Sequence, residues 1–207
     1  MKLLAALLLW CGLAQTTMAD RPGDFDYYVL SLSWSPQYCA SEARPNDPQC
    51  MRPYAFVVHG LWPQNERGWP RDCGRGEYLS DSLIAGALRF MPSKSLVIHE
   101  WRQHGVCTGL AAEAYFATAE RAYRAVRIPA RYHALQQPLK TSVAKIEADF
   151  LDENPKLKPE MLSTRCSGRY FRELRICLDR ALEPRACGAD LKDRCGSEVL
   201  LRPVRGG

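Results

Sequence analysis

The sequence predicts an α+β protein in which several helices pack around a central, mainly antiparallel sheet that disulfides stabilise. Two strand-like segments lie far apart in the chain, at 25–34 and 169–179. Segments with helical periodicity lie between them, so the strands that pair need not be neighbours in sequence. Eight of the nine cysteines follow an apolar N-terminal segment, and an even number of exported cysteines is typical of a disulfide framework.

The N-terminus resembles a secretory signal peptide over residues 1–19. An apolar run follows Lys2, and Ala19 has the small side chain that a signal peptidase accepts before its cleavage site. A membrane anchor is the alternative, but the run is shorter than the ~20 residues that span a bilayer. We expect this segment to be removed together with Cys11. Residues 20–207 would then be one catalytic domain that is secreted, or periplasmic if the source is a Gram-negative cell.

The cysteines that remain after export favour disulfides over zinc binding, because no two of them form a C-x-x-C pair. Spacing alone leaves many pairings open. Local closure favours Cys39–Cys50, whose short loop would contribute up to ~3 kcal/mol in the chain-entropy model. The eight cysteines expected to form disulfides are Cys39, Cys50, Cys73, Cys107, Cys166, Cys177, Cys187 and Cys195.

Composition places few limits on partners. The net charge is +5, and most basic residues are scattered arginines. Such an excess suits a polyanionic partner but is also common among soluble proteins. No linker, repeat or low-complexity segment divides the chain after residue 19, so we expect one domain with a sizeable core.

The first two predicted strands are separated by a loop. The segment FDYYVLSLSW at 25–34 is rich in aromatic and β-branched residues, with Tyr28, Leu30, Leu32 and Trp34 at alternate positions, and reads as a strand that Pro36 ends. A polar, proline-containing loop is expected over 40–53. The segment YAFVVHGLWP at 54–63 begins as a short buried strand, which we expect to break at Gly60.

Three helices and a late strand follow. The first helix is expected over 80–90 with Ser80 as its N-cap, and the second over 112–126. An apolar stripe that begins at Leu139 and ends before Asn154 marks a third. The segment RYFRELRICLD at 169–179 alternates apolar and charged side chains, which predicts a strand with one face in water.

The segment HEWRQHGVC at 99–107 contains two of the four histidines and suits either metal binding or proton transfer. In the zinc motif H-E-x-x-H, the histidines are four residues apart and share a helix face. His99 and His104 are five apart, which turns them roughly 140° from one another on a helix. No further cluster supplies a third ligand, so the spacing disfavours a metal site.

A second segment, FVVHGLWPQ at 56–64, places His59 at the end of an apolar strand beside a glycine. A lone histidine of this kind is more often structural. Two such segments with aromatic neighbours favour a chemistry that needs two imidazoles. RNA cleavage by its own 2′-OH is such a chemistry, because one group removes the 2′ proton and another protonates the departing 5′ oxygen. Imidazoles, with a pKa of about 6.5, suit both tasks.

Other residues of the two segments suit the same reaction. His99 and Arg102 would supply positive charge to the phosphate, and Glu100 a shared proton, as negative charge develops on the phosphate oxygens. Trp62 and Trp69 offer flat surfaces on which a base stacks. Each tryptophan taken alone is as well explained as a core residue.

The motifs HGLWPQ and HEWRQHGVC resemble the two active-site segments of the ribonuclease T2 family of secreted acid ribonucleases. YYVLSLSWSPQYC resembles the family's first strand, and RYFRELRICLD a late core strand. The resemblance spans roughly residues 25–180. It implies an α+β fold and metal-independent cleavage of single-stranded RNA without a cofactor, through a 2′,3′-cyclic phosphate to a 3′-phosphate.

The resemblance also implies roles for single residues. His59 matches the general acid and His104 the general base, while Glu100 matches a transition-state stabiliser. His99 matches a phosphate-binding residue and Trp62 a base-site residue. The disulfides that it implies are Cys73–Cys107 and Cys166–Cys195, with Cys177–Cys187 inside the latter.

Two departures from the family's pattern concern substrate binding. Many members have lysine immediately before the second catalytic histidine, where this chain has Gln103. We expect either that Arg102 supplies the charge instead or that the rate of cleavage is lower. Gln64 follows the W-P of the first motif, and its uncharged amide both donates and accepts hydrogen bonds. We therefore expect low base specificity.

Two other functions remain as alternatives. A non-catalytic RNA-binding relative would keep the scaffold but does not need the retained imidazole pair. A zinc hydrolase is disfavoured by the histidine spacing. We expect a monomer without metal or membrane association, and a bell-shaped pH profile with an optimum between mildly acid and neutral pH.

Overall fold

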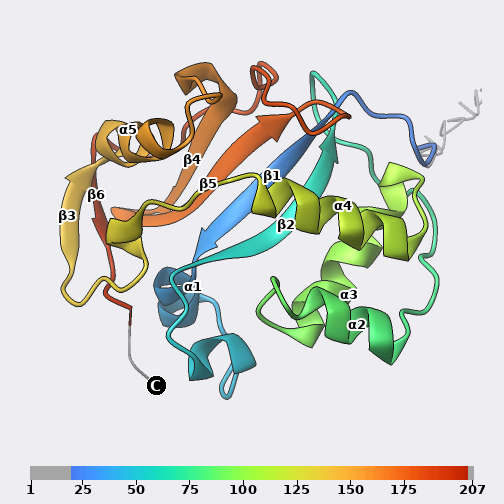
Figure 1. Ribbon diagram of the computed structural model, residues 1–207, viewed down its shortest axis with the longest axis horizontal. Coiled ribbons are helices and arrows are strands. Elements are labelled where there is room, and N and C mark those ends of the chain that lie inside the picture. Colours follow the sequence, from blue (N-terminus) through green and yellow to red (C-terminus); the bar gives the residue numbers. More distant parts are fainter. Residues whose placement is uncertain (1–19, 205–207) are drawn as a thin grey trace, which may run out of the picture.

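A six-stranded sheet forms the centre of the molecule, as the computed structural model shows for residues 20–204 (Figure 1). The signal peptide predicted over 1–19 lies outside the described residues. The strand order is β2-β1-β5-β6-β3, with β4 paired to β5, and every pairing is antiparallel except β5 with β6. The strands are β1 (Tyr27–Trp34), β2 (Phe56–Gln64), β3 (Leu139–Ser142), β4 (Leu162–Ser167), β5 (Tyr170–Leu178) and β6 (Glu198–Leu201).

Five α-helices surround the sheet, which confirms the predicted α+β class. Helices α2, α3 and α4 lie beside β2, whereas α5 lies at the other end, near β3 and β4 (Figure 1). Four short 3₁₀ turns lie at 48–51, 105–108, 130–132 and 159–161. The helices are α1 (Ser35–Ser41), α2 (Asp81–Ala87), α3 (Lys94–Gln103), α4 (Ala112–Arg124) and α5 (Val143–Glu153).

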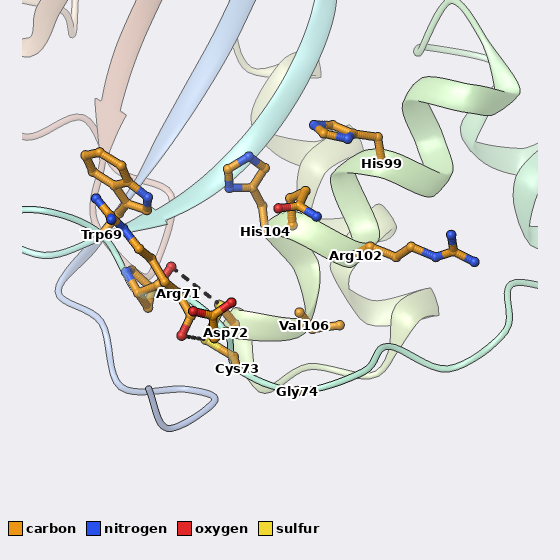
Figure 2. Close-up of a pocket in the computed structure, with 12 residues that line it drawn as sticks. Trp69, Arg71, Asp72, Cys73, Gly74, His99, Arg102, His104 and Val106 are labelled. Atoms are coloured by element: carbon orange, nitrogen blue, oxygen red, sulfur yellow. Dashed lines mark hydrogen bonds between the residues drawn. A yellow bond between two sulfur atoms is a disulfide. The ribbon is translucent and has the colours of Figure 1, made fainter. Parts of the chain in front are cut away.

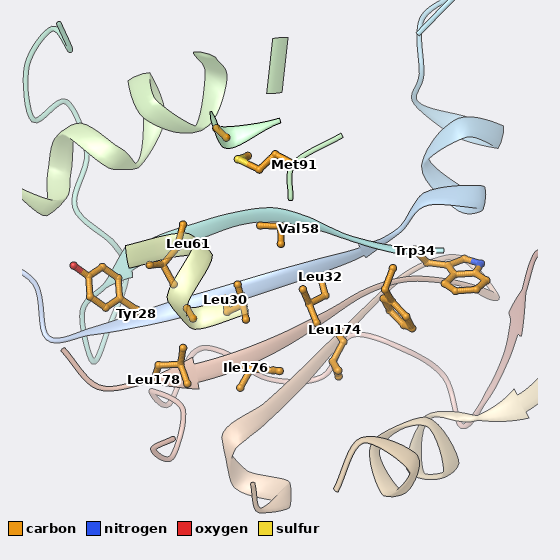
Figure 3. Close-up of a cluster of buried hydrophobic side chains, with 14 of the residues drawn as sticks. Tyr28, Leu30, Leu32, Trp34, Val58, Leu61, Met91, Leu174, Ile176 and Leu178 are labelled. Atoms are coloured by element: carbon orange, nitrogen blue, oxygen red, sulfur yellow. The ribbon is translucent and has the colours of Figure 1, made fainter. Parts of the chain in front are cut away.

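The main core covers one face of β1, β2 and β5. The alternation predicted for the first strand holds, because Leu30, Leu32 and Trp34 of β1 pack in the main core, whereas Val29 packs in a separate cluster. Leu174 and Ile176 of β5 pack beside them (Figure 3). Burying large apolar side chains in this way stabilises the fold by about 1.5–3 kcal/mol each.

Two β-bulges change the predicted course of the strands. In β2, Gly60 pairs with Ser31 and Val58 with Leu32, so His59 is an extra residue on that strand. The predicted break at Gly60 is therefore wrong, because the bulge lets β2 continue to Gln64. In β5 the register shifts in the same way around Arg172.

The second bulge places both Phe171 and Leu174 in the core. The prediction that one face of β5 meets water is wrong as well, since Glu173 on that face is only 2% exposed.

The helices differ from the predicted ones mainly in where they begin and end. The Ser80 side chain accepts the Leu83 N–H, as predicted, and α2 then ends at Ala87. The third predicted helix begins four residues later than expected, because Leu139 belongs to β3 and pairs with Leu201. At 35–41 the chain forms α1, with proline in its first turn, where the sequence indicated only the end of a strand and a loop.

Four disulfides cross-link the described chain, and they join the pairs that the local spacing and the family resemblance implied. Cys73–Cys107 ties the loop after β2 to the turn after α3. No helix in this part of the chain is both long and apolar enough to cross a membrane. The other three disulfides are Cys39–Cys50, Cys166–Cys195 and Cys177–Cys187.

Candidate active site

His59 sits at the bulge of β2 between two glutamates from different elements. Its Nδ1 lies 3.0 Å from Oε2 of Glu173 in β5, and its Nε2 lies 3.5 Å from Oε1 of Glu100 in α3. The ring keeps a side exposed, because 28% of its side chain is accessible to solvent. An imidazole held in this way can retain a proton and still reach a bound molecule.

The two carboxylates keep His59 charged. Burial disfavours the imidazolium, but the hydrogen bond to Glu173 and the negative charges of both glutamates outweigh it and raise the pKa of His59. Burial likewise disfavours the carboxylate of Glu173. The hydrogen bond from His59 and the charge of Arg175 overcome that effect and lower the pKa of Glu173 to about 2. Glu173 is therefore an ionised acceptor, and Nδ1 of His59 donates to it.

Glu100 lies beneath His59 and is completely buried. Its Oε2 accepts a 2.7 Å hydrogen bond from Nε1 of Trp62. Burial raises the pKa of Glu100 to about 7, even though the charge of His59 and the indole hydrogen bond oppose the rise. Gly60 allows this arrangement, because a Cβ at that position would collide with the Glu100 carboxylate and come within 2.6 Å of Nε1 of Trp62.

His104 lies at the C-terminal end of α3, where it is the capping residue. Its ring packs on Trp62 with centroids 5.2 Å apart, and His59 contacts the same indole at 5.1 Å. Burial lowers the pKa of His104 to about 3, and the positive charges of His59, His99 and Arg175 act in the same direction. One indole thus separates an imidazole that holds a proton from one that is neutral.

Three adjoining hollows meet at these histidines. His59 and His99 line a hollow of about 450 Å³, and His99 and His104 line another of about 520 Å³ (Figure 2). A third, of about 500 Å³, extends beyond His104 and is lined by Trp62 and Gln64 among others. His99 lines both the first and the second hollow, and His104 lines both the second and the third.

Comparison with known proteins places the chain in a family. The model of the Ribonuclease T2 family matches residues 25–187. The chain belongs to the ribonuclease T2 family. A ribonuclease of Aeromonas hydrophila is 35% identical over 194 residues, which cover 88% of each protein. A probable ribonuclease of Haemophilus influenzae is 33% identical over 178 residues, which cover 78% of this chain and 61% of that protein. This ribonuclease T2 protein is therefore an endoribonuclease.

Solved structures show the same fold. An RNase-related protein from Calystegia sepium has a TM-score of 0.70 at 21% identity, covering 87% of this chain and 98% of its own. RNase NT in complex with 5′-AMP has a TM-score of 0.67 at 22% identity, covering 87% and 99% of the two chains. The predicted family and fold class are thus confirmed.

The structure brings most of the predicted ribonuclease T2 site residues together, but Glu100 and Trp62 are more deeply buried than the contacts expected of them require. Glu100 is too deeply buried to touch a phosphate directly. Trp62 is 8% exposed, so it offers an edge and not an open stacking surface, whereas Trp69 is 46% exposed. Arg102 lines the same hollow as His99 and His104, although its guanidinium points away from both rings in Figure 2.

Glu173 and Arg175 are site residues that sequence reasoning missed. Their side chains hydrogen-bond one another through the Arg175 Nε–H, and the Arg175 guanidinium lies over the Trp62 ring at 4.8 Å. Both were assigned to the water-exposed face of a strand. The signal available in the sequence was two charges of opposite sign at alternate positions within an otherwise apolar strand, which also suits a buried ion pair.

Proposed function

We propose that this endoribonuclease cleaves single-stranded RNA by transphosphorylation, through a 2′,3′-cyclic phosphate to a 3′-phosphate, without a metal ion and with low base specificity. The opposite pKa shifts of His59 and His104 on the two sides of one indole carry the proposal. A cyclising cleavage needs one protonated and one neutral group beside the same phosphodiester.

The two imidazoles take different roles. His104, neutral because its pKa is lowered, removes the proton of the 2′-OH as that oxygen attacks phosphorus. His59, charged because its pKa is raised, donates its Nε2 proton to the departing 5′ oxygen. The roles reverse when water opens the cyclic phosphate, since His104 then holds the proton that the departing 2′ oxygen needs, and neutral His59 can take a proton from the attacking water.

Glu173, Glu100 and His99 have supporting roles around the two imidazoles. Glu173 is a positioning residue, because its hydrogen bond to Nδ1 fixes the His59 ring with Nε2 available for proton transfer. Glu100 acts through His59 and Trp62, not by contact with the phosphate. His99 borders the hollows on both sides of the reacting phosphate and would bind a non-bridging oxygen.

The proposed reaction needs no metal ion, because both of its proton transfers are assigned to histidine side chains. Among the described residues, no group of three or more His, Cys, Asp or Glu side chains is arranged to hold a metal ion. Low base specificity rests on the uncharged amide of Gln64 in the hollow beyond His104.

A defined single-stranded RNA digested in excess EDTA tests the proposal. Fragments that end first in a 2′,3′-cyclic phosphate and later in a 3′-phosphate are expected, with cuts after all four bases. His59→Ala and His104→Ala should each lower the rate by about 10²–10⁴-fold while circular dichroism shows a folded chain. A requirement for added metal would favour a hydrolase that uses a metal ion, and binding without cleavage would favour a non-catalytic relative.

The compartment and the assembly state belong to the same proposal. The four disulfides support export to an oxidising compartment. Residues 20–207 would then act there as a monomeric catalytic domain. A mature N-terminus at Asp20, and a single species of monomer mass in solution, are the expected results; a retained N-terminus or a dimer would contradict them.

A further inference from the structure

Three arginines gather in the hollow beyond His104. Arg165 comes from β4, Arg175 from β5 and Arg194 from the segment before β6. All three line the cavity of about 500 Å³ that His104 and Trp69 also border. We call this cavity the arginine hollow; the cleavage reaction described above does not use Arg165 or Arg194.

The fold holds two of these arginines side by side. Arg165 and Arg194 face one another in an isolated parallel β-bridge, and the Arg194 N–H donates to the Thr164 carbonyl at 3.0 Å. The disulfide Cys166–Cys195 joins the residues that immediately follow them. Like charges at paired positions of a sheet destabilise it. A covalent link that fixes this register therefore keeps two guanidinium groups close despite their repulsion.

The nearby acids are already engaged elsewhere. Glu173 is paired with His59 and Arg175. Asp193 accepts from the N–H of Thr164 at 2.7 Å and from its hydroxyl at 3.0 Å. Asp190 lines the hollow, but its Oδ2 accepts the Gly68 N–H at 2.6 Å. Three positive side chains and one negative side chain thus face the cavity.

Arg165 carries a buried hydrogen-bond donor that is left without an acceptor within residues 20–204. Its Nη1 is buried and has no hydrogen-bond partner among the described residues. Burial, together with the charges of Arg175 and Arg194, lowers its pKa. A buried donor without an acceptor costs stability. An anion entering the hollow would supply that acceptor and relieve the repulsion.

We propose that the arginine hollow binds a second phosphate of the RNA, the 5′-phosphate of the nucleotide whose 2′-OH attacks. This assignment rests on the proposed function, because it uses His104 as the base. The attacking 2′-OH lies at His104, and the leaving 5′ oxygen lies at His59. The upstream nucleotide therefore lies on the side of the arginine hollow, and its own 5′-phosphate points away from the reacting bond toward that cavity. Guanidinium groups suit this ligand because they bind phosphate oxygens in pairs.

Dinucleotides with different terminal phosphates test the proposal. The three substrates are NpN, which has the scissile phosphate alone, pNpN with an added 5′-phosphate, and NpNp with an added 3′-phosphate. The wild type should cleave pNpN with a kcat/KM about tenfold above that of NpN, as a charge-assisted hydrogen bond gives. NpNp should gain little. Arg165→Gln should remove the advantage of pNpN and leave the kcat/KM of NpN within about twofold.

The control variant is Arg89→Gln, which removes an equal charge from an exposed position just after α2, outside the arginine hollow, and should keep the pNpN advantage. Melting temperatures check the fold, and Arg165→Gln should not lower the melting temperature, because it relieves repulsion.

The proposal is overturned if wild type treats pNpN and NpN alike, if NpNp gains as much as pNpN, or if Arg165→Gln slows both NpN and pNpN equally, which would indicate a base contact or a structural role. Failure of wild type to cleave any of the three would instead overturn the proposed function.

Discussion

Replacing Glu173 by glutamine should move the alkaline limit of activity to lower pH. The substitution keeps the shape of the side chain and an oxygen that accepts from Nδ1 of His59, but it removes the buried negative charge. His59 would then release its proton more easily. Because His59 is proposed to act as the charged acid, activity is lost as pH rises through its pKa, and in the variant this loss begins earlier.

The size of the shift follows from the contact. Nδ1 of His59 and Oε2 of Glu173 are 3.0 Å apart. Charges centred ~4 Å apart attract by about 4 kcal/mol at an effective dielectric constant of about 20, which equals about three pKa units. The His59 side chain is 28% exposed and the amide keeps a hydrogen bond, so solvent and the remaining contact reduce the effect. We expect the alkaline limit of activity to move down by roughly one to two pH units.

The assay is kcat/KM for a short single-stranded RNA between pH 4 and pH 9, because this ratio reports pKa values of the free enzyme. Glu173→Gln should stay close to wild type at acid pH and fall behind it as pH rises, by about 10- to 100-fold well above the pKa of His59. Glu42→Gln is the matched control, since Glu42 lines the same hollow as His59 but pairs with Arg172 at 2.7 Å. The reasoning would be refuted if the alkaline limit of kcat/KM did not move in Glu173→Gln, or if it moved equally in Glu42→Gln.

Three further predictions concern the buried side of the site and its cross-links. Gly60→Ala should lower the free energy of unfolding by about 1–3 kcal/mol in urea titrations, because its Cβ collides with the Glu100 carboxylate; unchanged stability would show that the strand has room. Glu173 should stabilise the fold above its ordinary pKa and lose that contribution as pH falls toward about 2, so wild type should lose more stability than Glu173→Gln between pH 5 and pH 2, and parallel losses would contradict this. Replacing both Cys73 and Cys107 by alanine should lower the free energy of unfolding by about 2–5 kcal/mol, measured by thermal unfolding with reduced wild type as a control. An unchanged free energy of unfolding would show that this disulfide does not stabilise the fold.

The alternation of side chains predicted the first strand, but it failed wherever a bulge intervened. Periodicity assigns residues to faces by counting in twos, and one extra residue reverses the count. At His59 the bulge changes which residues pair with β1, and no feature of the sequence announces it. At Arg172 the same effect hid Phe171 from the predicted core. Glu173 lies beside Arg175 on the predicted face of the strand, but that face is covered and does not meet water.

The histidines of the site could be found from local motifs, whereas their partners could not. His59, His99 and His104 lie in two short segments whose residue types already suggest proton transfer. Glu173 comes from a strand more than a hundred residues later, and its contact with His59 depends on the pairing of β1 with both β2 and β5. Long-range contacts of this kind follow from topology, which a single sequence does not specify.

Burial explains the remaining differences. Trp62 was expected to offer a flat surface to a base, yet its indole is used to hold Glu100 and to separate two imidazoles. Whether a tryptophan faces water or the interior depends on the elements packed above it.

The most direct test of the account is a proton NMR titration of the four histidine rings, with His59 and His104 assigned by comparison with the two alanine variants. The account predicts that His59 stays protonated above pH 6.5, the ordinary value for histidine, while His104 remains neutral down to about pH 3. A His104 ring that gains its proton at a higher pH than His59 would contradict the assignment of base and acid on which the cleavage mechanism depends.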